Sequence, residues 1–199
     1  MYVAMNIVSA MLYDGYSSAS QTISELSAIG APTRSLWVPM GFVYTILVTA
    51  FGWGIWRSAV NHRFLRITGG LLILFGVIGL GWPFAPMHQR DALAAGGGTL
   101  TDTIHIAFSI VTVLLMLLAI GFSAAAFGKR FRIYAIVTLV VLLVFGTLTG
   151  LDAPKIDANL PTPWIGVWER INVGVFMLWV VVMAIVLLQA KEYEVPKAL

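Results

Sequence analysis

One stretch of the chain places groups suited to proton transfer on a single helix face. In "TLTDTIHIAFSIVT", residues 99–112, Asp102, His105, Ser109 and Thr112 follow one another at intervals of three and four residues. Such spacing puts all four side chains on one side of an α-helix. With His88, which follows "GWPFAPM", this set could form an acid–base pair or contribute metal ligands.

A metal site is weakly supported by the same residues. A hydrolytic metal site commonly takes three protein ligands, whereas His88 and His105 supply two. Neither HxxxH nor HExxH occurs, and GxSxG, P-loop and GxGxxG patterns are also absent from the sequence. The serine-hydrolase and nucleotide-binding classes therefore lack support. We predict no metal and no cofactor, with His88 and His105 as the candidate ligands if a metal does bind.

A second polar group begins the last apolar segment, "PTPWIGVWERIN", residues 161–172. Glu169 and Asn172 lie three residues apart and share a helix face, whereas Arg170 points about 100° away. A guanidinium stays charged in proteins, so Arg170 needs an acid, an anionic headgroup or water. We expect Glu169 to pair with His105, and Arg170 to pair with an acid from another segment, namely Glu25, Asp102 or Asp152.

Composition identifies the solvent around these groups. Of 199 residues, 59% are hydrophobic and 11% charged, and the mean hydropathy is +0.91, whereas about a quarter charged is usual in soluble domains. The absence of cysteine excludes disulfides, iron–sulfur clusters and thiol nucleophiles. The net charge of +3 fits Lys and Arg flanking membrane helices, so we expect no nucleic-acid partner.

Apolar runs predict an all-α membrane protein formed by one domain, residues 1–199. A bilayer crossing needs about 20 residues, and the first run is shorter than that, so its helix is short or truncated. In "GTLTG", Gly146 and Gly150 form a pair of small residues that allows close helix approach. The six predicted spans are residues 1–13, 35–56, 67–87, 103–128, 133–151 and 164–190.

Charge in the connections predicts the orientation of these spans. Eight of the twelve basic residues fall on one side, in the turns near Arg57–Arg66 and Lys129–Arg132 and in the tail with Lys191 and Lys197. Seven of the nine acids fall on the other side. Because Lys and Arg are enriched in cytoplasmic loops, both termini should be cytoplasmic.

The first outer loop, Tyr16–Arg34, contains the pattern of a short helix. Thr22 and Glu25 fit a capping box, Gly30 is suited to end the helix and Pro32 to prevent its resumption. We predict an interfacial helix at residues 23–29. It could be a structural lid, or it could cover a site that includes Glu25.

Three quoted features give this chain a resemblance to known proteins. "GYSSASQTISELSAIGAPTR", "WERIN" and the six-span plan resemble the bacterial DUF998 family of six-span membrane proteins. The "ISEL…G…P" element is distantly similar to "ISDTG…PP" of the Frag1/DRAM/Sfk1 proteins. The resemblance implies a multi-pass protein of the bacterial inner membrane that contacts lipid. DUF998 members usually have a longer first span, which favours a later start in this chain.

Three interpretations of the outer polar residues remain open: tied helix ends, a lipid-binding site, or a catalytic centre. We favour lipid binding without catalysis. The alternatives are a membrane-embedded hydrolase with candidates His88, Asp102, His105 and Glu169, and a structural subunit of a membrane complex. The expected partners are membrane lipids, with a second copy or another membrane protein as further candidates. The predicted ligand-binding residues are Glu25, His88, Asp102, His105, Asp152, Glu169, Arg170 and Asn172.

Overall fold

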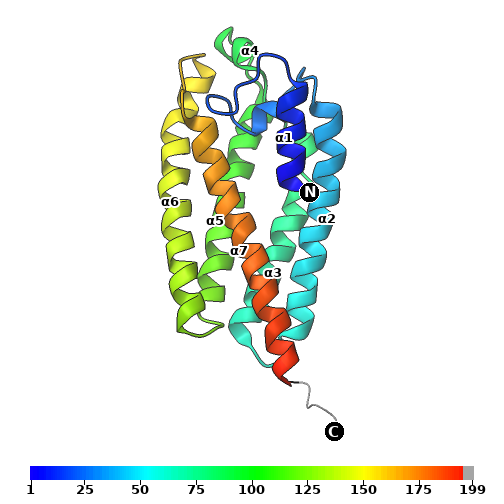
Figure 1. Cartoon of the computed structure of the whole chain (residues 1–199). Coiled ribbons are helices and arrows are strands. Elements are labelled where there is room, and N and C mark those ends of the chain that lie inside the picture. The colour runs from blue at the N-terminus through cyan, green and yellow to red at the C-terminus, as the bar shows by residue number, and fades with distance from the viewer. Residues whose placement is uncertain (195–199) are drawn as a thin grey trace.

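The computed structural model describes residues 1–194, and all regular elements in that range are helical (Figure 1). Residues 195–199, which include Lys197, lie outside the described part. The elements are the α-helices α1 (Tyr2–Leu12), α2 (Arg34–Ser58), α3 (Arg63–Gly79), α4 (Arg90–Ala94), α5 (Leu100–Ala124), α6 (Lys129–Asp157) and α7 (Ile165–Glu194), with the 3₁₀ turns η1 (Ser24–Ser27) and η2 (Trp82–Phe84).

Five helices are long and apolar enough to cross a membrane: α2, α3 together with η2, α5, α6 and α7. The chain is therefore a multi-pass membrane protein. These helices run side by side along the bundle, whereas α1, with 11 residues, covers only about half of its length (Figure 1). We call the end formed by residues 13–33, 80–99 and 158–164 the loop-rich end, and the other the opposite end.

The ends of α3 and α6 differ most from those expected, and α5 and α7 each differ by four residues at their ends. α3 stops at Gly79 rather than near residue 87, because the segment after it contains Pro83 and Pro86, which have no backbone N–H to donate. α6 continues through Pro154 to Asp157, beyond the predicted limit at residue 151. An ion pair within its last turns, Lys155 Nζ to Asp152 Oδ1 at 2.6 Å, supports this extension.

The most extensive contact between two helices is that of α2 with α3, and glycines allow their close approach. A Cβ on Gly52 would lie 2.8 Å from the Ile73 nitrogen, and one on Gly69 would lie 2.6 Å from the Trp56 nitrogen. Both contacts involve backbone atoms of the other helix, which cannot move aside cheaply. The two glycines therefore set the distance between the helices.

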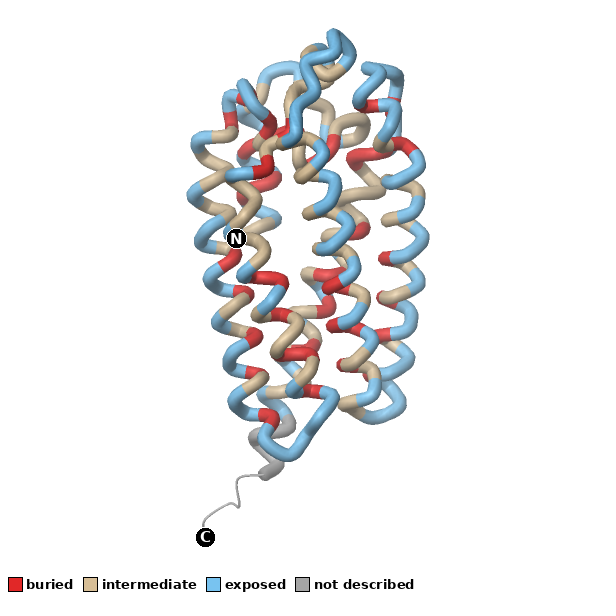
Figure 2. The backbone as a smooth tube through the Cα atoms, turned by 180° about the vertical axis from the view of Figure 1, so that it is seen from behind, coloured by how far each residue is buried: buried red, intermediate tan, exposed pale blue. Residues whose placement is uncertain are grey.

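A packed apolar core occupies the half of the bundle toward the opposite end. Its largest fully buried members, Phe176 and Trp179, are on α7, and buried positions alternate with exposed ones along the long helices (Figure 2). Trp179 donates its indole N–H to the Ser123 hydroxyl at 3.1 Å, so this buried polar atom is satisfied. Other buried core members are Val48, Ile55, Leu65, Leu72, Phe75, Leu115, Met116, Ile120, Phe131, Leu142 and Met183.

A smaller apolar cluster closes the loop-rich end. Ala28 and Ala31 from the first loop pack with Met87, Ile156 and Ile165 from three other segments. The Ile29 N–H donates to the Met87 carbonyl at 2.8 Å and connects two of these segments. We call this cluster the roof, because it joins the first loop to the end of α6 and the start of α7.

Candidate functional site

A cavity of about 870 Å³ lies between the roof and the packed core. Its walls are the first halves of α2, α5 and α7, the last turns of α3 and the second half of α6, with η1 and η2 at the loop-rich end. Ligand pockets in proteins usually have volumes of about 300–1,000 Å³. The space is thus large enough for a small molecule.

Polar and apolar residues line different levels of this cavity. Near the roof, the polar wall includes Asp102, His105 and Ser109 of α5, Glu169 and Asn172 of α7, and Arg34 at the start of α2. Toward the packed core, the wall formed by the described residues has no charged residue and is mostly apolar, with the uncharged Thr45 and Thr112 among side chains such as Phe75, Val113, Met116, Leu117 and Met177. The cavity is therefore amphipathic along its length.

One stripe of α5 shows that the cavity reaches the surface of the bundle. Ile106, Ile110 and Leu114 follow one another every four residues and line the cavity. Their exposed fractions are 52%, 65% and 51%. The stripe thus forms a rim where the cavity wall meets the apolar outer face of a membrane-spanning helix.

Glu169 lies one turn inside α7, where its carboxylate faces the cavity. Its Oε2 accepts the backbone N–H of Ile23 from the first loop. The expected pair with His105 does not form, because the His105 ring instead contacts a backbone carbonyl. One carboxylate oxygen thus holds the loop against α7, while the other accepts no hydrogen bond within the described residues.

His105 is fixed in orientation by two contacts. Its Nδ1 lies 2.8 Å from the Ala85 carbonyl oxygen, and its ring and that of Trp82 pack in a T-shaped arrangement with centroids 4.9 Å apart. A carbonyl can only accept, so Nδ1 carries the hydrogen and Nε2 of the neutral ring is an acceptor. The Ser109 hydroxyl donates to the His105 carbonyl at 2.9 Å and is used within the helix.

His88 and Asp102 form a pair at the start of α5. Asp102 Oδ1 accepts the His88 N–H at 2.7 Å, and its Oδ2 lies 2.8 Å from His88 Nδ1. The same carboxylate accepts the Thr99 N–H at 2.8 Å and completes a capping box with the Thr99 hydroxyl. Asp102 thus organises the helix start, and its oxygens are occupied by the chain itself.

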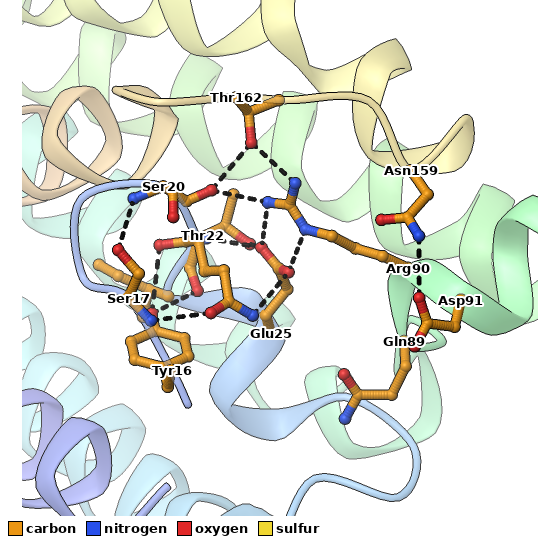
Figure 3. Close-up of polar contacts among 12 residues, drawn as sticks. Tyr16, Ser17, Ser20, Thr22, Glu25, Gln89, Arg90, Asp91, Asn159 and Thr162 are labelled. Atoms are coloured by element: carbon orange, nitrogen blue, oxygen red, sulfur yellow. Dashed lines mark hydrogen bonds and ion pairs between the residues drawn. The ribbon is translucent and has the colours of Figure 1, made fainter. Parts of the chain in front are cut away.

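Glu25 is fully buried in the roof region and pairs with Arg90, not with Arg170 (Figure 3). The two guanidinium contacts are 2.5 Å from Nε to Oε1 and 2.9 Å from Nη2 to Oε2. Arg90 also donates to the Thr162 hydroxyl at 2.7 Å and to the Ser20 carbonyl at 2.9 Å. This ion pair therefore joins three loops of the loop-rich end.

The helix expected at residues 23–29 is a single 3₁₀ turn, Ser24–Ser27. Half of the predicted capping box is present, since Glu25 accepts the Thr22 N–H at 2.7 Å. The Thr22 hydroxyl, however, donates to Glu25 at 2.9 Å and caps no backbone N–H. The Glu25 carboxylate therefore accepts hydrogen bonds from both Thr22 and Arg90, and it joins the turn to another loop.

Arg170 has backbone partners where an acid was expected. Its guanidinium donates to the carbonyls of Ser18 at 2.8 Å and Gln21 at 3.1 Å, to the Tyr16 hydroxyl at 2.7 Å and to Asn6 Oδ1 at 3.2 Å. Neither Glu25, Asp102 nor Asp152 lies within ion-pair distance of it. Arg170 thus attaches the first loop and α1 to α7.

Burial raises the pKa of Tyr16 to about 12, and its hydrogen bond from Arg170 opposes this shift. The Tyr16 hydroxyl itself donates to the Thr22 carbonyl at 2.7 Å. The donation to the Thr22 carbonyl requires the neutral phenol, whereas the Arg170 contact needs only the phenol oxygen as acceptor.

Four of the predicted ligand-binding residues come together on the cavity wall: Asp102, His105, Glu169 and Asn172. The others lie elsewhere. Glu25 is in the roof region, Arg170 lines a separate groove between α1 and α7, and Asp152 pairs with Lys155 on α6. Within residues 1–194 no group of three His, Asp or Glu side chains is arranged to hold a metal ion.

Two important cations were not among the predicted site residues. Arg34 lines the cavity, and Arg90 holds Glu25. In the sequence both belong to polar segments, where a basic residue is usually solvated and does not indicate a binding site. A usable signal was their place on the acid-rich side of the membrane, where Arg34, Arg90, Lys155 and Arg170 are the only basic residues in the sequence.

Five apolar helices surround an amphipathic cavity. The molecule is therefore a multi-pass membrane helix bundle with a candidate binding site in its interior. The chain belongs to the family described as "Protein of unknown function (DUF998)", whose model matches residues 1–186. No match was found among curated proteins or solved structures.

Proposed function

We propose that this protein binds a membrane amphiphile, meaning a molecule with a polar headgroup and an apolar chain, in the cavity below the roof. The observation that supports this most is the division of the cavity wall. The charged residues of the wall lie at the level near the roof, and the level near the packed core is lined mainly by apolar residues. A lipid-like ligand has the same division along its length.

The rim on α5 offers a route for such a ligand. Ile106, Ile110 and Leu114 are exposed on a membrane-spanning helix and also line the cavity. An amphiphile could therefore pass from the bilayer without leaving an apolar environment. Its headgroup would remain at the level of the polar wall, close to the end of the spans.

The loop-rich end is proposed to face the extracytoplasmic side of a bacterial inner membrane. Arg57, Arg63, Lys129 and Arg130 lie at or near the two turns of the opposite end, as expected for a cytoplasmic surface. The bound headgroup would then belong to the outer leaflet.

A hydrolase at the same place has less support. His105 offers one free ring nitrogen, but His88 is bound to Asp102 and does not line the cavity. Ser109 donates its hydroxyl within its own helix. A nucleophile with an adjacent base, which such chemistry requires, is not assembled by these residues.

Lipid retention in a cavity-filled variant tests the proposal. Ser109→Trp places an indole in the polar level of the cavity, and Ala107→Trp places the same group on an exposed position of α5 outside the cavity. Native mass spectrometry of both variants, purified from defined lipid mixtures, should show less bound lipid for Ser109→Trp alone. Equal retention in the two variants would contradict binding in the cavity.

A further inference from the structure

Three charged residues on the cavity wall, Arg34, Asp157 and Glu169, belong to no ion pair within the described residues. Among the described residues, the ion pairs are His88–Asp102, Arg90–Glu25 and Lys155–Asp152. Asp157 is exposed at the end of α6, whereas Arg34 and Glu169 are partly buried, so these two are the unpaired charged residues inside the cavity. Charged groups at this depth in a membrane protein are costly unless paired or hydrated, so the partly buried wall offers a ligand one cationic side chain, Arg34, and one acidic side chain, Glu169.

Arg34 keeps part of its hydrogen-bonding capacity free. Nη1 donates to the Ser27 carbonyl at 2.5 Å and Nη2 to the Pro83 carbonyl at 3.2 Å. A guanidinium has five N–H donors in a planar fork, so further donors remain for a ligand. Because carbonyl oxygens do not neutralise its charge, an anionic group of phosphate type would suit it well.

Glu169 provides an acidic group on the cavity wall that could contact the cationic part of a ligand. Only the backbone N–H of Ile23 donates to its carboxylate among the described residues. The aromatic residues Tyr2, Trp37 and Tyr44 line the same cavity, with the Tyr2 ring 5.8 Å from Trp37 and 5.0 Å from Tyr44. Carboxylates and aromatic faces together are groups that favour an ammonium ion.

The two side chains contact opposite ends of the turn η1. Glu169 holds the N–H of Ile23 at the start of η1, and Arg34 holds the carbonyl of Ser27 at its end. A 3₁₀ helix rises about 2 Å per residue, so these backbone positions are about 8 Å apart. A headgroup with its two charges a few bonds apart could contact both side chains at ordinary hydrogen-bond distances of about 3 Å.

We propose that the amphiphile has a zwitterionic headgroup, with its phosphate on Arg34 and its ammonium on Glu169. This inference rests on the proposed amphiphile binding and specifies its ligand class. A purely anionic headgroup would leave Glu169 unpaired beside it, and a purely cationic one would leave Arg34 unpaired. Only the zwitterion satisfies both residues at once.

Competition between lipids with identical acyl chains tests this inference. The purified protein is equilibrated with equal amounts of phosphatidylcholine, phosphatidylethanolamine, phosphatidylglycerol and a trimethylammonium lipid, and the retained lipids are counted by native mass spectrometry. The two zwitterionic lipids should be retained about tenfold over the others, as the loss of one charge-assisted hydrogen bond implies. A preference between these two would identify a quaternary or a primary ammonium.

Charge variants assign the two contacts. Glu169→Gln, which can still accept the Ile23 N–H, should lower the ratio of zwitterionic to anionic lipid about tenfold. Arg34→Gln should lower the ratio of zwitterionic to cationic lipid by a similar factor. Matched controls are Asp14→Asn and Arg130→Gln, which change the same charges at exposed positions outside the cavity and should leave both ratios unchanged.

The outcomes separate this inference from the proposed function. If all four lipids are retained equally, yet Ser109→Trp still reduces retention, amphiphile binding stands and the zwitterionic headgroup is wrong. Ratios that respond equally to the cavity variants and to the controls would also contradict the headgroup contacts. Retention that is insensitive to Ser109→Trp would overturn both proposals.

Discussion

Glu25 and Arg90 are 65 residues apart in the sequence and form a doubly hydrogen-bonded ion pair, with contacts of 2.5 and 2.9 Å. Glu25 is fully buried, and Arg90 is 14% exposed. Both carboxylate oxygens and three guanidinium nitrogens have partners (Figure 3). The loops that form the roof are thus joined by one satisfied polar network.

Arg90→Gln should destabilise the loop-rich end. The substitution leaves the buried carboxylate of Glu25 without its counter-charge, and breaking a buried pair in this way costs about 3–5 kcal/mol. We expect a lower Tm in detergent and faster hydrogen exchange in residues 17–31. Arg130→Gln, at an exposed position of the opposite end, provides the control and should leave both measurements unchanged.

The double variant Glu25→Gln/Arg90→Gln sharpens this prediction. Removing both charges leaves two neutral amides in place of one unpaired ion, so it should be less destabilising than Arg90→Gln alone. Additive losses in the two single variants and their combination would mean that the pair contributes nothing specific.

Gly166→Ala should loosen the first loop, since a Cβ at Gly166 would lie 2.2 Å from the Gln21 carbonyl oxygen and 2.5 Å from that of Ser18. Gly174 is on the same helix with no atom within 4 Å of its Cβ position. Gly174→Ala should therefore be neutral or gain about 0.5–1 kcal/mol from helix propensity. Limited proteolysis of residues 13–33 distinguishes the two, and equal protection in both variants would contradict the contact.

Raising the pH above about 10 should weaken the attachment of the first loop through Tyr16. Its pKa is raised by burial to about 12, so the folded chain keeps a proton that the unfolded chain loses. Since the folded state binds more protons, stability is complete below the ordinary tyrosine pKa and falls as the pH rises toward 12.

The measurement is Tm against pH for the parent and Tyr16→Phe. Tyr16→Phe should be less stable near neutrality, because Arg170 and the Thr22 carbonyl lose a hydrogen-bond partner. It should also have a shallower decline between pH 10 and 12. Parallel curves would show that Tyr16 does not contribute to the decline.

The long helices could be predicted from the sequence because a segment that crosses a bilayer must be apolar over about 20 consecutive residues. Five apolar runs near residues 35–190 correspond to α2, α3, α5, α6 and α7. The predicted ends of α3 and α6 are less accurate, because proline follows the end of one helix and lies within the other. Pro83 follows the end of α3, whereas Pro154 lies inside α6. Whether a helix ends at a proline or continues through it depends on contacts of the next turn with neighbouring segments, and a single sequence does not contain these tertiary contacts.

The cavity wall was partly predictable and the roof was not. Asp102 and His105 share a face of α5 by spacing alone, so their common position followed from helix geometry. The partners of Glu25 and Arg170 did not, because each could reach several acids or bases and a single sequence contains no distances. Arg170 in particular satisfies its charge with carbonyl oxygens, which every residue has and no pattern reveals.

Topology remains open to a direct test. If the turns near Arg57–Arg66 and Lys129–Arg132 are cytoplasmic, a phosphatase reporter that is active only outside the cytoplasm should be silent when fused after Leu199. The same reporter inserted in the exposed "AAGGG" segment, residues 94–98, should be active. The reverse result would place the cavity in the cytoplasmic half of the membrane.

The last prediction concerns Gly146 and Gly150, which look equivalent in the sequence. A Cβ on Gly146 would lie 2.9 Å from Asn172 Nδ2, whereas one on Gly150 has no neighbour within 4 Å. Asn172 is buried and donates to the Leu142 carbonyl at 2.7 Å. Gly146 therefore leaves room for a hydrogen bond from α7 to α6, and Gly150 does not contribute to it.

Gly146→Ala should consequently be less stable than Gly150→Ala, by about 1 kcal/mol, within the range measured for hydrogen bonds between membrane helices. Tm values of the two variants in the same detergent provide the comparison. In an Asn172→Ala background the hydrogen bond is already absent, so adding Gly146→Ala should then cost no more than adding Gly150→Ala. A persistent difference in that background would show that Gly146 is needed for another reason, and equal stability in the native background would mean that Asn172 can move aside without losing its partner.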